Sequence, residues 1–202
     1  MSEQEKEVKY YVNRLKDVEN RIIKLGASLI QPRTFEFNLL FDNGEEALSN
    51  NFQYLRLRRD SLSRLTFKGA AEIIDGVNTR KEIEIEVSSF ETTKSLLEAL
   101  DYRVILIYEK YRTTYKKGKF IITLDEMPFG DFVEIEGIGS QGIKEISIEI
   151  GLNWEERILR GYLNLYKVVV MNAHRKFDNL TFSDFAGIII TPEILDVNPA
   201  DM

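Results

Sequence analysis

Residues 80–87 read RKEIEIEV, and acidic and aliphatic side chains alternate one by one from Glu82 to Val87. A period of two places the glutamates on one face of a β-strand and the aliphatic side chains on the other. The same alternation recurs at residues 5–12, 34–41, 53–59, 64–68, 105–115, 119–125 and 132–138. Short spacings, with turn residues between several of these segments, predict an antiparallel meander of about eight strands that closes, or nearly closes, into a barrel.

Helices are predicted between and after the strands. Residues 17–27, 90–100 and 155–175 each space their apolar side chains for one buried stripe. Residues 143–150 fit a strand and a helix equally well, because their isoleucines match both periods. From residue 179 onward we expect the first part to pack on the barrel and the last few residues to fray.

Composition narrows the classes of function. The chain has 202 residues, enough for one domain with a substantial core or for two small ones. It contains no cysteine, which excludes disulfides, thiolate metal sites and a catalytic thiol. The net charge of −6 argues against nucleic acid or an anionic membrane as a partner. A polar N-terminus and short apolar runs predict neither a signal peptide nor a membrane span, so we expect a cytoplasmic protein.

The charged faces of the strands have two interpretations. An antiparallel sheet with one wet face also alternates in this way and carries cross-strand ion pairs there. Here the pattern persists over many strands, however, and the predicted helices can cover the apolar faces from outside. We therefore predict that the charged side chains point into the barrel.

A charged interior is better explained by function than by stability. Confined charges lose hydration, and like charges repel each other unless ligands or counter-ions neutralise them. Clustered carboxylates suit Mg²⁺ or Mn²⁺, whereas arginine and lysine suit phosphate oxygens. A triphosphate with a divalent metal ion needs both sets of side chains in one place, and the sequence supplies both.

Six motifs follow one another in an order typical of one superfamily. Residues 5–9 read EKEVK, an ExExK pattern, and the later motifs are LRLR at 55–58, TFKG at 66–69, RKEIE at 80–84, KYR at 110–112 and a closing segment at 124–137. Together they resemble the CYTH, or triphosphate tunnel metalloenzyme, superfamily, which includes class IV adenylate cyclase-like and thiamine triphosphatase-like proteins. The resemblance implies an α+β fold in which an eight-stranded antiparallel β-barrel forms a tunnel with a charged lumen and helices packed outside.

The resemblance also implies roles for individual residues. The expected triphosphate-binding residues are Lys9, Arg56, Arg58, Lys68, Arg80, Lys110 and Arg112. The expected ligands of Mg²⁺ or Mn²⁺ are Glu5, Glu7, Asp125, Glu134 and Glu136. The expected catalytic residues are Glu82, Glu84 and Lys110. It further implies a helix for residues 143–150, a tunnel domain at 1–178 and a C-terminal extension at 179–202, in a monomer or homodimer.

Three functions are compatible with this resemblance. The first is hydrolysis of tripolyphosphate, a nucleoside triphosphate such as ATP, or thiamine triphosphate. The second is cyclisation of ATP to cyclic AMP and pyrophosphate, and the third is non-catalytic binding of polyphosphate or nucleotide. Cyclases of the superfamily tend to carry a His-Phe pair before the ExExK motif, whereas this chain begins Met-Ser-Glu-Gln, which favours hydrolysis.

Overall fold

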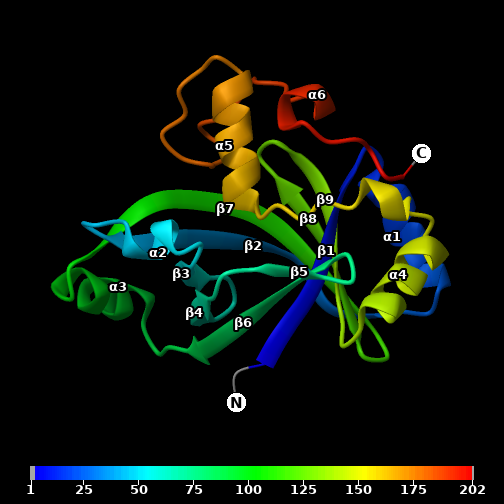
Figure 1. The fold of residues 1–202 in the computed structure, drawn as a ribbon, viewed down its shortest axis with the longest axis horizontal. Helices are drawn as coiled ribbons and strands as arrows, with labels where there is room; N and C mark the ends of the chain where they lie inside the picture. The colour runs from blue at the N-terminus through cyan, green and yellow to red at the C-terminus, as the bar shows by residue number, and fades with distance from the viewer. Residues whose placement is uncertain (1–2, 202) are drawn as a thin grey trace.

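Eight strands close into an antiparallel barrel in the computed structural model, which describes residues 3–201 (Figure 1). Around the barrel the order is β1-β9-β8-β7-β2-β3-β4-β6, and β6 pairs with β1 to complete the circle. The barrel strands are β1 (Glu3–Val12), β2 (Ser28–Asn43), β3 (Tyr54–Arg59), β4 (Ser63–Lys68), β6 (Val77–Glu86), β7 (Tyr102–Lys117), β8 (Phe120–Met127) and β9 (Gly130–Glu136). The predicted fold class is confirmed.

Two features of the sheet were not predicted. A short strand, β5 (Glu72–Ile74), forms a hairpin with the start of β6 and lies outside the closed circle. In addition, β2 and β7 are each 16 residues long and extend well past the alternating segments. Their pairing is irregular near Pro32, where the register shifts between Gln31 and Thr34. Proline donates no ladder hydrogen bond, so regular alternation is not expected at that point.

Helices cover much of the apolar outer face of the barrel (Figure 1), although Ile83 and Ile85 on β6 stay exposed. The helices α1 (Leu15–Lys24) and α4 (Ser140–Glu149) bury Ile22 and Ile146 in one cluster with the outward side chains of β1, β8 and β9. On another side, α3 (Phe90–Ala99) packs on β2 and β3 and begins at Ser89, whose hydroxyl accepts from the Thr92 amide. The ambiguous segment 143–150 is thus helical, as the resemblance implied.

The predicted helix at 155–175 is wrong in its first part. A 3-10 turn (Trp154–Glu156) is followed by extended chain, and the helix α5 spans only Tyr162–Asn172. The Ile158 amide donates to the Lys9 carbonyl at 2.6 Å, which draws this segment against β1. A tertiary hydrogen bond therefore overrides a local apolar spacing that fits a helix.

The helix α5 closes one end of the barrel, where Figure 1 shows it standing over the strands. Its Leu165 and Val169 share an apolar cluster with Leu40, Tyr108 and Phe132, which point inward from β2, β7 and β9. A short helix, α6 (Pro192–Leu195), adds Leu195 to the same cluster, and α2 (Ala47–Asn50) lies between β2 and β3. Among the described residues, no helix has the length and apolarity needed to cross a bilayer.

The described end of the chain is fixed to the barrel, contrary to the expected fraying. The Ala200 amide donates to the Tyr11 carbonyl at 2.9 Å. The buried Asp201 carboxylate accepts from the backbone amides of Asn13 and Arg14, at 3.0 and 2.8 Å. These amides lie just before α1 and have no partner within the helix, so the C-terminus caps the first helix of the chain.

Replacing Asp201 tests this cap. We expect Asp201→Ala to lower the free energy of unfolding by about 1–2 kcal/mol, because two backbone amides lose a charged acceptor. The exposed Asp178 provides a control, and Asp178→Ala is expected to change stability by less than about 0.5 kcal/mol. Urea unfolding followed by circular dichroism measures both. Equal stabilities of the two variants would contradict the assignment of Asp201 as a cap.

Candidate active site

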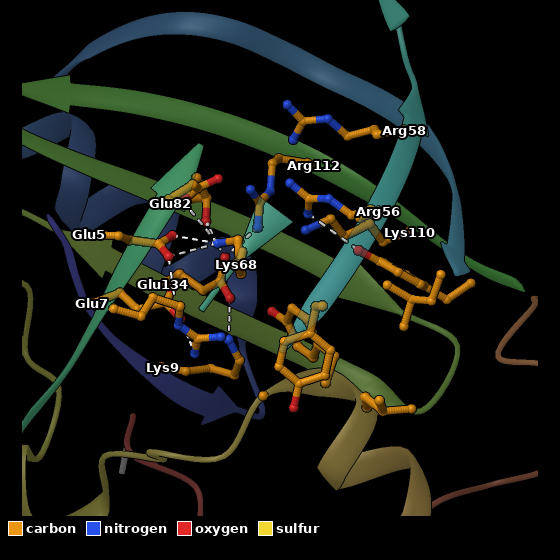
Figure 2. A pocket seen from close by; sticks show the side chains of 18 of the residues that line it. Glu5, Glu7, Lys9, Arg56, Arg58, Lys68, Glu82, Lys110, Arg112 and Glu134 are labelled. Carbon is orange, nitrogen blue, oxygen red and sulfur yellow. Dashed lines mark hydrogen bonds and ion pairs between the residues drawn. The ribbon is translucent and has the colours of Figure 1, made fainter. Parts of the chain in front are cut away.

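A cavity of about 260 Å³ lies inside the barrel and is lined by charged side chains from six of the eight barrel strands (Figure 2). A single water needs only about 10–15 Å³ by this kind of measure, so the cavity can hold a ligand. Every predicted site residue except Asp125 lines it. The lining residues from the prediction are Glu5, Glu7, Lys9, Arg56, Arg58, Lys68, Arg80, Glu82, Glu84, Lys110, Arg112, Glu134 and Glu136.

Strand pairing explains why these residues meet. Residues directly opposite in neighbouring strands share one face of the sheet, so an inward residue faces another inward residue. Glu5 lies opposite Arg80, and Lys9 lies opposite Glu134. The alternation seen in each single strand thus becomes a set of opposite charges around the lumen.

Asp125 lies behind the cavity wall and is fully buried. Its carboxylate accepts hydrogen bonds from Lys110 at 3.0 Å, from Arg112 at 2.5 and 2.6 Å, and from the Tyr162 hydroxyl at 2.8 Å. Both oxygens are occupied by donors of this chain. Asp125 therefore holds Lys110 and Arg112 in place. Its predicted role as a metal ligand stays a prediction.

Glu36 is a second buried anchor, and it was not among the predicted site residues. Its carboxylate lies 3.5 Å from the Lys110 ammonium and 3.6 Å from the Arg58 guanidinium. Burial alone would raise the pKa of Glu36, but Lys110, Arg112 and Arg58 hold it down at about 2. The signal was present in the sequence, because Glu36 occupies an inward position of the strand predicted at 34–41.

Other cations of the lining are held by acidic partners. Lys68 donates to both oxygens of Glu5, at 2.6 and 2.8 Å, and lies 3.2 Å from Glu82. Lys9 donates to Glu134, which also accepts from Arg112. Burial would raise the pKa of Glu134, but Lys9 and Arg112 hold it well below its usual range. The Glu134 carboxylate is therefore ionised in the folded protein.

Glu84 is shared as an acidic partner by Arg56, at 3.6 Å, and by its neighbour Arg58. The Arg58 guanidinium makes ion pairs at 3.5–3.6 Å with Glu36, Asp60 and Glu84 but no hydrogen bond among the described residues. Burial lowers its pKa, and the neighbouring Arg56 lowers it further. Arg56 itself donates only to uncharged oxygens, those of Tyr108 and Thr66, both at 3.3 Å. Two guanidiniums with unused capacity are what a bound anion needs.

Negative charge is in excess near the other end of the cavity. Glu136 is an exposed residue at the edge of the cavity, and the partial loss of hydration of its carboxyl there raises its pKa to about 7; Glu5, Glu7 and Glu82 contribute to the rise while Lys68 opposes it. Figure 2 shows Glu5, Glu7 and Glu82 on the opposite side of Lys68 from Arg56 and Lys110. Carboxylate oxygens in such surplus are the donors that Mg²⁺ and Mn²⁺ prefer.

The negative charge of this acidic end suits a cation, although its carboxylates do not converge on one point. Within residues 3–201, no group of three or more carboxylates or imidazoles has the spacing of a ready metal site. Glu5 is hydrogen-bonded to Lys68, and Glu7 lies 3.4 Å from Arg80. A divalent ion would therefore have to replace these cations as partner of the carboxylates.

Tyr162, which falls within the helix predicted at 155–175, also lines the cavity. The Lys9 ammonium lies 4.0 Å from the centre of its ring, and its hydroxyl donates to Asp125. The helical stripe around Tyr162 gave no indication of this position, which depends on how α5 meets the barrel. His174 and Trp154 do not line the cavity.

Comparisons with known proteins agree with this geometry. A protein of Methanocaldococcus jannaschii, named as a candidate adenylate cyclase, is 25% identical over 168 residues, which cover 82% of this chain and 89% of that protein. A crystal structure of a candidate adenylate cyclase from Vibrio parahaemolyticus has a TM-score of 0.73 at 20% identity and covers 83% of this chain and 99% of that one.

A third similar structure is that of a candidate adenylyl cyclase from Hippeastrum, with a TM-score of 0.62 at 18% identity, covering 83% of this chain and 95% of that one. It is described as having a dominant triphosphatase activity. The model of the CYTH domain matches residues 3–162, which is most of the chain. With its closed barrel and charged lumen, this chain belongs to the CYTH domain family.

Proposed function

We propose that this protein is a divalent-metal-dependent enzyme that binds a triphosphate inside the barrel and hydrolyses one of its phosphoanhydride bonds. The observation that carries the proposal is the pair of guanidiniums of Arg56 and Arg58 in the cavity, whose Nε atoms have no hydrogen-bond partner among the described residues. Buried like charges are costly, and a polyphosphate anion would neutralise them. Stability alone offers no reason to place them there.

The phosphate chain would be held by the cations of the lumen. Arg56, Arg58 and Arg112 offer planar forks that match phosphate oxygens, while Lys9 and Lys68 act as point charges. Several of these cations already hold carboxylates, so a bound phosphate would exchange one anionic partner for another. Asp125 and Glu36 would stay behind the wall and keep Lys110 and Arg112 in place.

A divalent ion would be held at the acidic end by Glu5, Glu7 and Glu136. When bound there, Mg²⁺ or Mn²⁺ neutralises charge on the phosphate oxygens and lowers the barrier to attack on phosphorus. Glu134 and Asp125, which complete the predicted set of metal ligands, are held by Lys9, Lys110 and Arg112 in the present arrangement.

Glu82 and Glu84 are the proposed groups that orient and deprotonate the attacking water. Glu84 accepts from the Thr66 hydroxyl at 2.7 Å and lies 3.5 Å from Arg58, which fixes its carboxylate beside the phosphate-binding cations. Glu82 lies 3.2 Å from Lys68 and retains more free acceptor capacity. Lys110, almost fully buried at 1% exposure, would stabilise the negative charge that develops as the bond breaks.

Cyclisation of ATP is the second candidate. The observation in its favour is the name of the Methanocaldococcus jannaschii relative, which matches most of this chain. In that reaction the ribose 3′-hydroxyl would attack the α-phosphorus, and pyrophosphate would leave. The same lining serves both reactions, which differ in the phosphorus that meets the nucleophile. The Hippeastrum protein, described as dominantly a triphosphatase, has a barrel of the same fold, which is compatible with hydrolysis as the main activity.

Product analysis tests the proposal directly. Purified protein incubated with Mg²⁺ or Mn²⁺ and either tripolyphosphate or ATP should release inorganic phosphate, measured colorimetrically and by ³¹P NMR. Cyclic AMP with pyrophosphate as the main product of ATP would favour the second candidate. Tight binding of both compounds without any product would refute an enzymatic function.

Substitution of Arg58 should separate binding from stability. We expect Arg58→Gln to weaken tripolyphosphate binding by at least about tenfold, because a charged hydrogen bond to phosphate is worth about 1.5–3 kcal/mol. The free energy of unfolding should change by less than about 1 kcal/mol, because within residues 3–201 Arg58 makes ion pairs at 3.5–3.6 Å but no hydrogen bond, and Arg56 repels it. Calorimetric titration and urea unfolding measure the two quantities.

The neighbouring Arg59 is the matched control for this experiment. It lies on the outer face of β3, half exposed, and pairs with Glu91 at 3.3 Å. Arg59→Gln should leave tripolyphosphate affinity unchanged within about twofold. An Arg58→Gln variant that binds tripolyphosphate as tightly as Arg59→Gln would contradict the proposed phosphate site.

Glu136 should make stability depend on pH. Because its folded pKa of about 7 exceeds the ordinary value of 4.5, the folded protein retains a proton that the unfolded chain loses between these values. The stability that Glu136 contributes is therefore present below about pH 4.5 and is lost as the pH rises through about 7. We expect Glu136→Gln to lose this dependence, so that its Tm rises relative to that of the unmodified protein from pH 5 to 8.

The exposed Glu149 on α4 supplies a control, because Glu149→Gln should keep the pH dependence of the unmodified protein. A difference in Tm between Glu136→Gln and the unmodified protein that stays constant from pH 5 to 8 would contradict the assignment of this pH dependence to Glu136.

Mg²⁺ or Mn²⁺ should also bind more tightly at pH 8 than at pH 6, as the acidic end must lose a proton to bind a cation.

A further inference from the structure

One edge of β6 is left without a neighbouring strand at its C-terminal end. On one side β6 pairs with β4 as far as Glu86. On the other side it pairs with β1 only as far as Glu82, which lies opposite Glu3, and Figure 1 shows the two strands diverging from there. No strand within residues 3–201 pairs with the following residues of β6 on that side. We name residues 83–87 the open edge of β6.

Backbone hydrogen-bonding groups point outward along this edge. The Val87 amide donates to the Ser63 carbonyl of β4 at 2.9 Å. Successive residues of a strand turn their backbone groups to opposite sides, so those of Glu84 and Glu86 face away from β4. Two amides and two carbonyls in line on one edge form a template on which another strand can pair.

The open edge lacks two of the devices that protect other edges. Proteins protect exposed edges with proline, with bulges and with charged side chains. The part of β2 before Phe37 has no partner in β3, and Pro32 and shifts of register interrupt it. The open edge contains neither a proline nor a shift of register. Its outward side chains Ile83 and Ile85 are 44% and 54% exposed, so apolar surface remains available beside the backbone groups.

The charges of the open edge indicate what kind of strand fits it. Glu84 is already occupied, since its carboxylate accepts from the Thr66 hydroxyl at 2.7 Å. Glu86 is exposed, and its cross-strand neighbour Arg64 is paired with Asp60 at 2.9 Å instead. A basic side chain opposite Glu86 would therefore supply a counter-charge that this edge does not provide for itself.

A second copy of this chain fits the open edge poorly. Two copies paired about Ile85 would bring their isoleucines together, but Glu84 of each copy would lie opposite Glu86 of the other. Like charges directly opposite each other destabilise a strand pair. The glutamates therefore disfavour self-association and leave the edge to a strand with the opposite charge pattern.

We propose that the open edge of β6 binds an extended segment of a partner protein, which adds a strand antiparallel to residues 83–87. The segment carries a basic residue opposite Glu86, an uncharged polar residue opposite Glu84, and aliphatic residues on the face of Ile83 and Ile85. Its backbone exchanges hydrogen bonds with that of Glu84 and Glu86. This interaction requires neither a bound triphosphate nor hydrolysis.

A fluorescently labelled peptide tests the interaction by anisotropy. Its central residues, valine-lysine-valine-threonine-valine, match the proposed pattern in antiparallel register. We expect saturable binding that Glu86→Lys weakens at least about fivefold, because a cross-strand attraction becomes a repulsion. The exposed Glu72 on β5 provides the matched control, since Glu72→Lys makes the same change of charge and should alter the affinity by less than about twofold. Circular dichroism verifies that both variants are folded.

Methylation of the peptide backbone tests whether the peptide pairs as a strand. In the proposed register, the peptide residues opposite Glu84 and Glu86 direct their amides at the protein, and the residues between them direct their amides away. N-methylation of the lysine and the threonine should therefore abolish binding. N-methylation of two valines changes the peptide by the same number of methyl groups and should retain binding.

Four results would overturn the proposal. They are absence of peptide binding, equal losses for the two methylated peptides, equal affinities of Glu86→Lys and Glu72→Lys, and a dimer of the unmodified protein that Ile85→Lys dissociates. Analytical ultracentrifugation measures the last of these, which would assign the open edge to a second copy of this chain. Binding that depends on Glu86 and on the amides of the lysine and threonine would support the proposal.

Discussion

The structure depends on keeping many opposite charges neutralised inside a barrel with little access to water. Two carboxylates buried in the wall, Asp125 and Glu36, make this possible on one side, because they hold Lys110 and Arg112 in position. Each ion pair offsets only part of the free energy that its two side chains lose when they leave water. The apolar core is consequently displaced to the outer face, where α1, α3 and α4 cover the strands.

The charged side chains are not paired equally along the lumen, and this uneven pairing is the basis of the proposed binding of a polyphosphate with a divalent ion. Arg56 and Arg58 keep unused hydrogen-bond donors among the described residues, whereas around Glu136 the acids outnumber the cations. A polyphosphate chelating a divalent ion has the complementary distribution of charge. The closed end adds a third, apolar region, which the C-terminal segment builds over the barrel.

Much of this could be predicted from sequence because the alternation of charged and apolar residues is local. The strand at 80–87 already separates Glu82 and Glu84 from Ile83 and Ile85, and the structure keeps that separation. What could not be predicted depends on contacts between distant segments. Ile158 pairs with Lys9 and stays extended, and Asp201 caps α1. Tyr162 enters the cavity because α5 crosses the end of the barrel.

Locating tripolyphosphate in a crystal of the protein, grown with Mg²⁺ at saturating concentration, tests the central claim most directly. The account predicts electron density for the phosphate chain within the lumen, with oxygens in hydrogen-bond contact with Arg56, Arg58 and Arg112. Phosphate density confined to the outer surface, with ion pairs of the lumen unchanged, would contradict it.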